Sequence, residues 1–191
     1  MQSSPPATTA AVGRKAAAAR TRATLIDTGL ILAERTGLAG LSVNVLVAEA
    51  GVSKGTFFHH FGDRSTYLLC LHREFHDRIA EQIQDAVATM SPGRRRLMAA
   101  ANTYLDGCLQ HRGVRALLLE ARAEPAVNSE IARRNADTAE LCRPDFAAIG
   151  RQHPLQGAQL WVAMTAEAAL LELQSRNRLP GARAALEEFL R

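Results

Sequence analysis

The sequence predicts an all-α protein, and three observations support this fold class. Hydrophobic residues make up 47% of the 191 residues and are mainly Ala and Leu, which favour helices. Apolar residues recur at steps of three and four along most of the chain. Runs of β-branched residues are scarce, so no strand is predicted. A chain of this length can form one compact domain or a small module joined to a larger one.

Residues 1–20 are predicted to be a disordered lead-in that becomes helical after Arg14, because they are rich in Ala, Pro, Ser and Thr. The first 22 residues contain four basic side chains and no acidic one: Arg14, Lys15, Arg20 and Arg22. The formal net charge of the whole chain is only +4, so basic charge gathers at this end. This pattern favours nucleic acid as a partner, although a solubilising tail has the same composition.

A small domain of three short helices is predicted over residues 21–68. The first helix follows apolar residues at helical spacing as far as Gly37, a residue type that often ends helices. Ser42 is placed as the N-cap of the second helix. Ser53 is placed as the N-cap of the third helix, which Gly62 ends.

Residues 69–191 are predicted to form a second, helical domain. A long helix from Asp63 or Ser65 to Met90 joins it to the first domain, and is the only helix that we expect to link the two directly. Pro and Gly positions separate the later helices, and Pro144 interrupts or restarts one of them. These later helices are predicted at residues 97–109, 113–122, from 125 to the loop at 150–154, 155–173 and after 180.

Residues 155–191 are predicted to form a homodimer interface. The helix over 155–173 is apolar on more than one face, and the last segment has an apolar stripe that ends at Leu190. Such helices need cover on two sides, so they are predicted to pair with their copies as a four-helix bundle. Glu167 lies among Ala and Leu, and either faces solvent or forms a pair across the interface.

Several other classes of protein lack support in the sequence. The cysteines are odd in number and have no C-x-x-C spacing, so Cys70, Cys108 and Cys142 are predicted to be reduced core thiols. No stretch approaches the roughly 18 apolar residues of a membrane span, and the N-terminus lacks the apolar run of a secretion signal. A cytoplasmic protein without a membrane partner is therefore predicted.

No enzyme motif is evident, so neither catalytic residues nor a cofactor are predicted. The sequence contains no nucleophile elbow, no Gly-rich phosphate loop and no paired carboxylates in a suitable arrangement. His72 and His76 lie four apart on one helix face and could hold a metal together, but no third ligand is evident. We expect these histidines to lie on a partly exposed helix surface instead.

The segment Leu41–Arg64, LSVNVLVAEAGVSKGTFFHHFGDR, reads as helix, tight turn, helix. Gly51 supplies the turn, and Ser53 opens a helix whose amides and positive dipole end suit a phosphate. In a helix-turn-helix motif the second helix enters the major groove with its first residues facing base edges. Lys54 is placed to make such a contact.

This segment resembles the TetR family of bacterial repressors, whose signature runs roughly T-x-x-x-I-A-x-x-A-G-V-S-x-G-T-x-Y-x-H-F-x-x-K. The match spans Ser42 to Arg64, with A-G-V-S-K-G-T and H-F intact. The family's tyrosine is Phe58 here, so a hydroxyl that commonly bonds phosphate is missing. The usual lysine is Arg64, which keeps the charge, and the usual alanine after the isoleucine is Val47.

The resemblance implies which residues meet DNA. Phosphate contacts are implied for Ser42, His60 and Arg64, and groove contacts for Lys54, Gly55, Thr56 and His59. Ser53 at the helix start and Phe58 at the tyrosine position complete this predicted DNA-binding set. A glycine at 55 lets the backbone approach DNA closely. Phe57 and Phe61 are predicted core anchors of the reading helix.

The resemblance also implies that the C-terminal domain binds a small-molecule effector and changes the spacing of two DNA-reading heads. For each candidate pocket residue, plain core packing is favoured over ligand contact. The candidates are Met98, Tyr104, Leu105, Cys108, Leu117, Leu118, Arg122, Phe146, Trp161 and Met164. The implied function is a repressor that binds palindromic double-stranded operator DNA as a dimer and is released by the effector. An activator or architectural factor without a ligand is the alternative.

Overall fold

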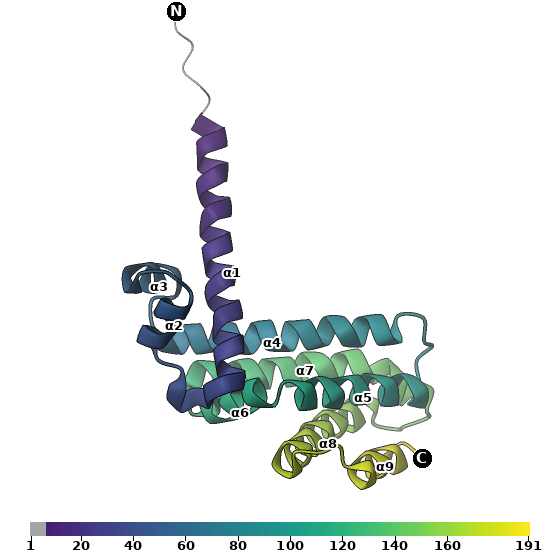
Figure 1. Ribbon diagram of the computed structural model, residues 1–191. Coiled ribbons are helices and arrows are strands. Elements are labelled where there is room, and N and C mark those ends of the chain that lie inside the picture. Colours follow the sequence, from purple (N-terminus) through teal and green to yellow (C-terminus); the bar gives the residue numbers. More distant parts are fainter. Residues whose placement is uncertain (1–6) are drawn as a thin grey trace, which may run out of the picture.

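The structure is a computed structural model that describes residues 7–191, without the side chains of residues 7–10, 38 and 39. The described part of the chain is all helical, as predicted, and has no strand. Figure 1 shows α1 to α3 at one end of a bundle formed by α4 to α9, with the start of α1 projecting from both. The helices are α1 Ala7–Gly40, α2 Val43–Glu49, α3 Lys54–Phe61, α4 Arg64–Val87, α5 Arg94–Gln110, α6 Arg112–Glu120, the 3-10 helix η1 Ala121–Ala123, α7 Pro125–Ala148, α8 Pro154–Ser175 and α9 Pro180–Phe189.

Helix α1 begins earlier than the sequence analysis expected. The prediction of a disordered lead-in over residues 1–20 is wrong from Ala7 onward, since α1 already begins there; residues 1–6 lie outside the described part. Ala has the highest helix propensity, and the Ala-rich composition outweighs the missing tertiary contacts. Gly37 adopts φ 63° and ψ −167°, so it breaks the helical run where the sequence predicts a stop.

The N-caps predicted at Ser42 and Ser53 are confirmed, and of the two predicted start residues of the next helix one acts as its cap. Ser42 Oγ accepts a hydrogen bond from the amide nitrogen of Val45 at 3.2 Å. Ser53 caps α3 in the same way, and Asp63, rather than Ser65, caps α4. Gly51 between α2 and α3 has φ 67°, a left-handed conformation that favours glycine. Local sequence signals therefore define this region well.

Helices α6 and α7 differ in detail from the prediction. The predicted helix over 113–122 is α6 followed by η1, and η1 ends just before Pro125 begins α7. Pro144 neither interrupts nor restarts α7, which continues to Ala148. A proline removes the hydrogen bond to the carbonyl four residues earlier. Here that carbonyl belongs to Glu140, an exposed residue, so water can take the lost bond.

An aromatic cluster fixes α3 to α4 and α1. Phe57 and Phe61 are 0% and 4% exposed, which confirms their predicted role as core anchors. Their ring centroids lie 5.2 and 4.9 Å from that of Tyr67. The Tyr67 hydroxyl donates a hydrogen bond to the backbone oxygen of Leu25 at 2.8 Å. A Cβ added at Gly29 would lie 1.9 Å from this hydroxyl, so glycine is required for α1 to approach α4 so closely.

Helix α6 forms a second link between the two domains, so the expectation that α4 alone joins them is wrong. Both carboxylate oxygens of Glu34, on α1, accept hydrogen bonds from the first turn of α6. The donors are the backbone nitrogens of Gly113 at 2.9 Å and Val114 at 3.2 Å. A Cβ at Gly113 would lie 2.4 Å from the Cα of Glu34, so the two helices touch through their backbones. Sequence spacing cannot reveal such a long-range cap.

Helix α9 packs against its own subunit. Leu186 and Leu190 of its apolar stripe are 4% and 1% exposed within the subunit. The sequence analysis expected this stripe to face a second subunit, and that expectation is wrong. Arg183 of α9 is buried and pairs with Glu172 of α8 through two hydrogen bonds of 2.8 Å. No helix in the described part of the chain is both long and apolar enough to cross a membrane.

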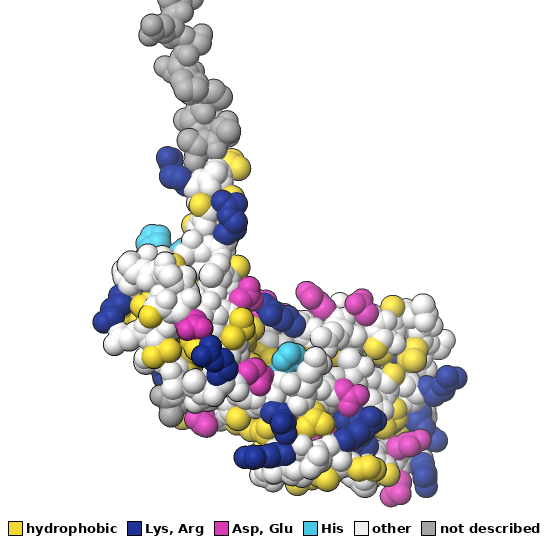
Figure 2. Space-filling view, viewed as in Figure 1, with side chains coloured by type: hydrophobic (Ala, Val, Ile, Leu, Met, Phe, Trp, Pro, Cys, Tyr) yellow, Lys and Arg dark blue, Asp and Glu magenta, His cyan; other side chains and the backbone are white. Residues whose placement is uncertain are grey.

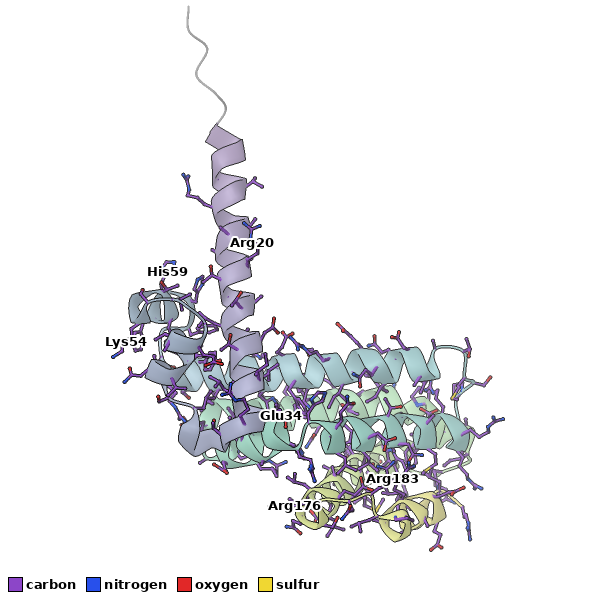
Figure 3. All side chains as sticks on the ribbon, viewed as in Figure 1. Arg20, Glu34, Lys54, His59, Arg176 and Arg183 are labelled. Carbon is purple, nitrogen blue, oxygen red and sulfur yellow. The ribbon has the colours of Figure 1, made fainter. Side chains whose placement is uncertain are left out.

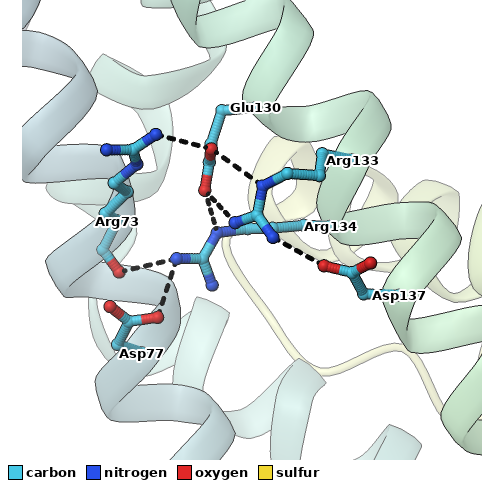
Figure 4. A network of polar contacts seen from close by, with 6 residues as sticks. All are labelled: Arg73, Asp77, Glu130, Arg133, Arg134 and Asp137. Carbon is cyan, nitrogen blue, oxygen red and sulfur yellow. Dashed lines mark hydrogen bonds and ion pairs between the residues drawn. The ribbon is translucent and has the colours of Figure 1, made fainter.

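A buried carboxylate joins α4 to α7 (Figure 4). Glu130 of α7 has a side chain that is 3% exposed and accepts hydrogen bonds from three guanidinium groups. Arg73 comes from α4, whereas Arg133 and Arg134 lie on α7 itself. Arg134 also reaches back to Asp77 of α4 at 2.7 Å. The hydrogen bond from Arg133, followed by that from Arg73, lowers the pKa of Glu130 to about 2.

Candidate nucleic-acid interface

Helix α3 buries one face and presents the other. Phe57 and Phe61 occupy the buried face, as described above. Lys54, Gly55 and His59 are exposed, and Figure 3 shows Lys54 and His59 on the outer side of α3. The two phenylalanines therefore determine which residues of α3 face outward.

The first turn of α3 has donors that suit an anion. Ser53 Oγ accepts from the amide nitrogen of Thr56 at 3.0 Å and lies 2.9 Å from the Thr56 hydroxyl. The amides of Lys54 and Gly55 have no partner within the helix, because they belong to its first turn. Together with the positive end of the helix dipole, these donors can bind a phosphate oxygen.

Gly55 has no packing reason to be glycine. A Cβ built at this position meets only Ser53 Oγ, at 3.6 Å, which is ordinary contact distance. Its φ lies outside the left-handed region that would require glycine. Alanine would suit the helix better by up to about 1 kcal/mol. The open space beside this backbone is consistent with close approach by a partner outside the chain.

Two of the predicted phosphate-contact residues come together beside α3. Ser42 and Arg64 are both exposed, and both line one shallow hollow between α2 and the start of α4. His60 is not among the residues that line this hollow; it is half-buried near the C-terminal end of α3. Phe58 is 49% exposed, which is unusual for a large apolar side chain. The outer face of α3 thus combines a cation, imidazoles and an apolar ring.

The projecting part of α1 carries basic side chains. Arg14, Lys15 and Arg20 are exposed on it, and no acidic residue precedes Asp27 in the chain. Figure 2 shows Lys and Arg side chains on the helix where it leaves the body, and Figure 3 labels Arg20 there. Arg22 differs, because its guanidinium lies 5.2 Å from the centre of the Phe61 ring. Helix α1 therefore adds a positive arm next to α3.

The comparison with protein families identifies this helix-turn-helix. The model for bacterial regulatory proteins of the tetR family matches residues 25–66, which cover the second half of α1, α2, α3 and the start of α4. The helix-turn-helix part of the chain is thus of the TetR type. No curated protein sequence matches it.

Solved structures share the fold of this protein over nearly its whole length. A transcriptional regulator from Rhodococcus sp. Rha1 is 21% identical with a TM-score of 0.76, over 88% of this chain and 93% of its own. A TetR-family transcriptional regulator from Pectobacterium atrosepticum is 25% identical with a TM-score of 0.74, over 92% and 95%. The multidrug binding protein EbrR, in complex with imidazole, is 22% identical with a TM-score of 0.72, over 89% and 94%.

The predicted effector-pocket residues differ in how deeply they are buried. Arg122 is exposed. No residue of the predicted set lines the hollow between α2 and α4, or a second hollow between α1 and α4. Phe146 and Trp161 pack together, with ring centroids 6.4 Å apart, near α9. The buried members are Leu105, Cys108, Leu117, Leu118, Phe146 and Trp161, and the half-buried members are Met98, Tyr104 and Met164.

The predicted pocket set lacks two buried polar residues of this domain. His72 is 2% exposed, so its expected place on a partly exposed surface is wrong, and its ring lies 4.4 Å from that of His76. Within residues 7–191, three or more potential metal ligands do not converge anywhere. Arg115 is 3% exposed. Its position three residues before Leu118, on the same helix face, was the available signal for its burial.

Proposed function

We propose that this protein is a transcriptional repressor that binds a palindromic operator as a dimer and is released by a small-molecule effector. The observation that carries this proposal is the exposed first turn of α3, where Lys54 and Gly55 have no role in packing. In helix-turn-helix proteins this turn faces base edges in the major groove. Two heads related by twofold symmetry would then read two half-sites.

The exposed residues of this surface have chemistry that suits DNA. Lys54 can reach the acceptor edge of a guanine. Phe58 can pack on a thymine methyl group, an apolar contact that replaces the hydroxyl contact of the family's tyrosine. The remaining proposed roles are phosphate contacts by Ser42, Ser53, His60 and Arg64, and groove contacts by Thr56 and His59. The basic arm of α1 is proposed to contact the DNA backbone or the adjacent minor groove.

A stripe on α8 is the proposed dimer interface. Leu160 and Leu171 are 58% and 42% exposed, and Ala163 and Glu167 lie exposed between them at helical spacing. Large apolar side chains that are exposed along one helix face are typical of interaction sites. Because the apolar stripe of α9 faces inward, we propose that the outer face of α8 contributes most of the apolar contacts between subunits.

The effector is proposed to act through α4 and α6. EbrR, which shares this fold, is described as a multidrug binding protein, and this supports a small-molecule site in the C-terminal domain. Helix α4 holds α1 through Tyr67, and α6 holds α1 through Glu34. An effector that binds one arrangement of these helices more tightly would shift the spacing of the heads.

Substitution of Gly55 by alanine tests the DNA-binding surface. We expect Gly55→Ala to leave the folded protein as stable as before, or more stable by up to about 1 kcal/mol, because the new methyl group meets nothing unfavourable. We expect operator binding to weaken by at least ~10-fold, since the methyl group keeps the backbone away from DNA. Fluorescence anisotropy with operator DNA and urea unfolding measure the two effects.

Gly181→Ala is the matched control for this experiment. Gly181 also lies exposed near the start of a helix, and a Cβ there meets nothing within 4 Å. It is on α9, far along the chain from the DNA-reading helix, so this variant should bind operator DNA like the wild type. Wild-type DNA binding by Gly55→Ala would contradict the proposed contact surface.

A further inference from the structure

Arg115 is a buried cation without an internal partner. Its side chain is on α6, and its Nε and Nη2 atoms are both buried and make no hydrogen bond in the described part of the chain. A buried guanidinium without hydrogen-bond partners is costly to fold. The two unpaired nitrogens also form one edge of the guanidinium plane, the edge that binds both oxygens of a carboxylate. The protein thus has a buried bidentate donor that pairs with no acceptor in the described part of the chain.

Three carboxylates of the helices around Arg115 are already bound elsewhere, while Glu167 of α8 is exposed. Glu130 accepts hydrogen bonds from three other arginines, and Glu172 from Arg183. Glu34 caps the start of α6 through backbone amides. None of these groups is hydrogen-bonded to Arg115, so its positive charge has no carboxylate partner within residues 7–191.

Polar side chains from three elements lie near enough to Arg115 for its charge to act on their pKa values. The rings of His76 and Tyr104 are nearly parallel, at 15°, with centroids 6.4 Å apart. The His72 ring lies beside that of His76 with the two planes tilted by 46°, and its Nδ1 atom is buried without a hydrogen bond. We name these residues the Arg115 cluster: His72 and His76 from α4, Tyr104 from α5, Arg115 from α6 and Arg122 from η1.

The cluster is positive but contains neutral donors. Burial, and then the charge of Arg134, lowers the pKa of His72 to about 4, and burial lowers that of His76 as well. Burial raises the pKa of Tyr104, so its hydroxyl keeps its proton. Burial and the charge of Arg115 lower the pKa of Arg122, although exposed Glu167 partly offsets this. The imidazoles and the phenol can therefore donate hydrogen bonds at neutral pH without adding charge.

We propose that the Arg115 cluster binds a small organic carboxylate as the effector, with its two oxygens on Nε and Nη2 of Arg115. This inference rests on the proposed function, because it names the chemistry of the effector. One buried guanidinium compensates one negative charge, so a monoanion fits better than a phosphate. The three rings of the cluster contact the rest of the ligand. Since Arg115 lies two residues after Gly113, ligand binding acts directly on the helix turn that Glu34 holds.

The first test needs no ligand. Arg115→Met keeps the length of the side chain but removes the unpaired charge, so the melting temperature of the variant should equal or exceed that of the wild type. Arg95→Met, at an exposed position on α5, is the control for loss of one arginine and should leave the melting temperature unchanged. A large fall in the melting temperature of Arg115→Met would show that Arg115 is a structural residue and would overturn the proposal.

The second test uses sodium benzoate and sodium octanoate, with benzamide, octanamide and inorganic phosphate as comparisons. At least one carboxylate should raise the melting temperature of the wild type and of Arg95→Met, whereas its amide and phosphate should not. Arg115→Met should bind that carboxylate ~100-fold more weakly. Equal stabilisation by acid and amide, no stabilisation by either acid, or retained binding in Arg115→Met would each overturn the proposal.

Operator binding in the presence of the same compounds separates this inference from the proposed function. A carboxylate that stabilises the wild type and also weakens operator binding supports both. If it stabilises the protein but leaves operator binding unchanged, the anion site stands and effector release is wrong. If only neutral compounds release the operator, effector release stands and the carboxylate inference is wrong.

Discussion

Leu160→Glu should convert the regulator from dimer to monomer and remove high-affinity operator binding. Leu160 is 58% exposed on α8 and is the most exposed large apolar residue of the stripe that we propose as the dimer interface. A glutamate there would place two like charges in an apolar interface, which should weaken dimerisation by ~100-fold or more. Each monomer would then bind a half-site alone and lose the gain from two linked heads. Light scattering after size exclusion, and anisotropy with operator DNA, measure these effects.

Ile31→Glu is the control for this prediction. Ile31 is an aliphatic residue on α1 with the same exposed fraction as Leu160, 58%. Its substitution therefore replaces an equally exposed apolar side chain by the same charged one. This variant should remain a dimer. A dimeric Leu160→Glu protein, or dissociation of both variants, would contradict an interface on the outer face of α8.

Glu130→Gln should cause a large loss of stability. The side chain is 3% exposed and binds three guanidinium groups, so the amide would leave their positive charges without the carboxylate that holds α4 to α7. Breaking such a buried network costs about 3 kcal/mol. Urea unfolding at pH 7 measures this loss. Glu140→Gln on the same helix, where an exposed glutamate pairs with exposed Arg143, should change stability by less than about 0.5 kcal/mol.

The loss of stability in Glu130→Gln should depend on pH. The pKa of Glu130 is lowered from 4.5 to about 2, so its charge stabilises the folded state at pH values above 4.5. This contribution disappears as pH falls from about 4.5 to about 2, because the carboxyl is then protonated in both states. The free energies of unfolding of wild type and variant should therefore converge over this window. A constant difference down to pH 3 would contradict the assigned role.

The sequence predicted the local features of the fold better than the long-range ones. The caps at Ser42 and Ser53, and the burial of Phe57 and Phe61, follow from side-chain chemistry at fixed spacing within one short segment. The inward face of α9 was not predicted, because an apolar stripe does not indicate whether it packs within a subunit or between subunits. The Arg115 cluster was missed because it joins residues from four separate elements.

For the candidate DNA interface, too, the sequence predicted local features but not long-range contacts. Lys54, Gly55 and His59 lie on the exposed face of α3 because their spacing places them opposite the two anchors. The role of Glu34 as a cap of α6 depends on a contact between residues 79 positions apart. No local pattern predicts such a contact, so the second link between the domains emerges only from the structure.

The measurement that tests the central claim most directly is binding of the purified protein to the DNA upstream of its own gene, at two salt concentrations. The account predicts tight, salt-sensitive binding that prefers this DNA over unrelated DNA. Lys54→Ala should weaken binding by ~10- to 100-fold and reduce the preference, whereas Arg95→Ala should not. Equally weak binding of the wild type to every fragment, or no effect of Lys54→Ala, would contradict the claim that α3 reads an operator.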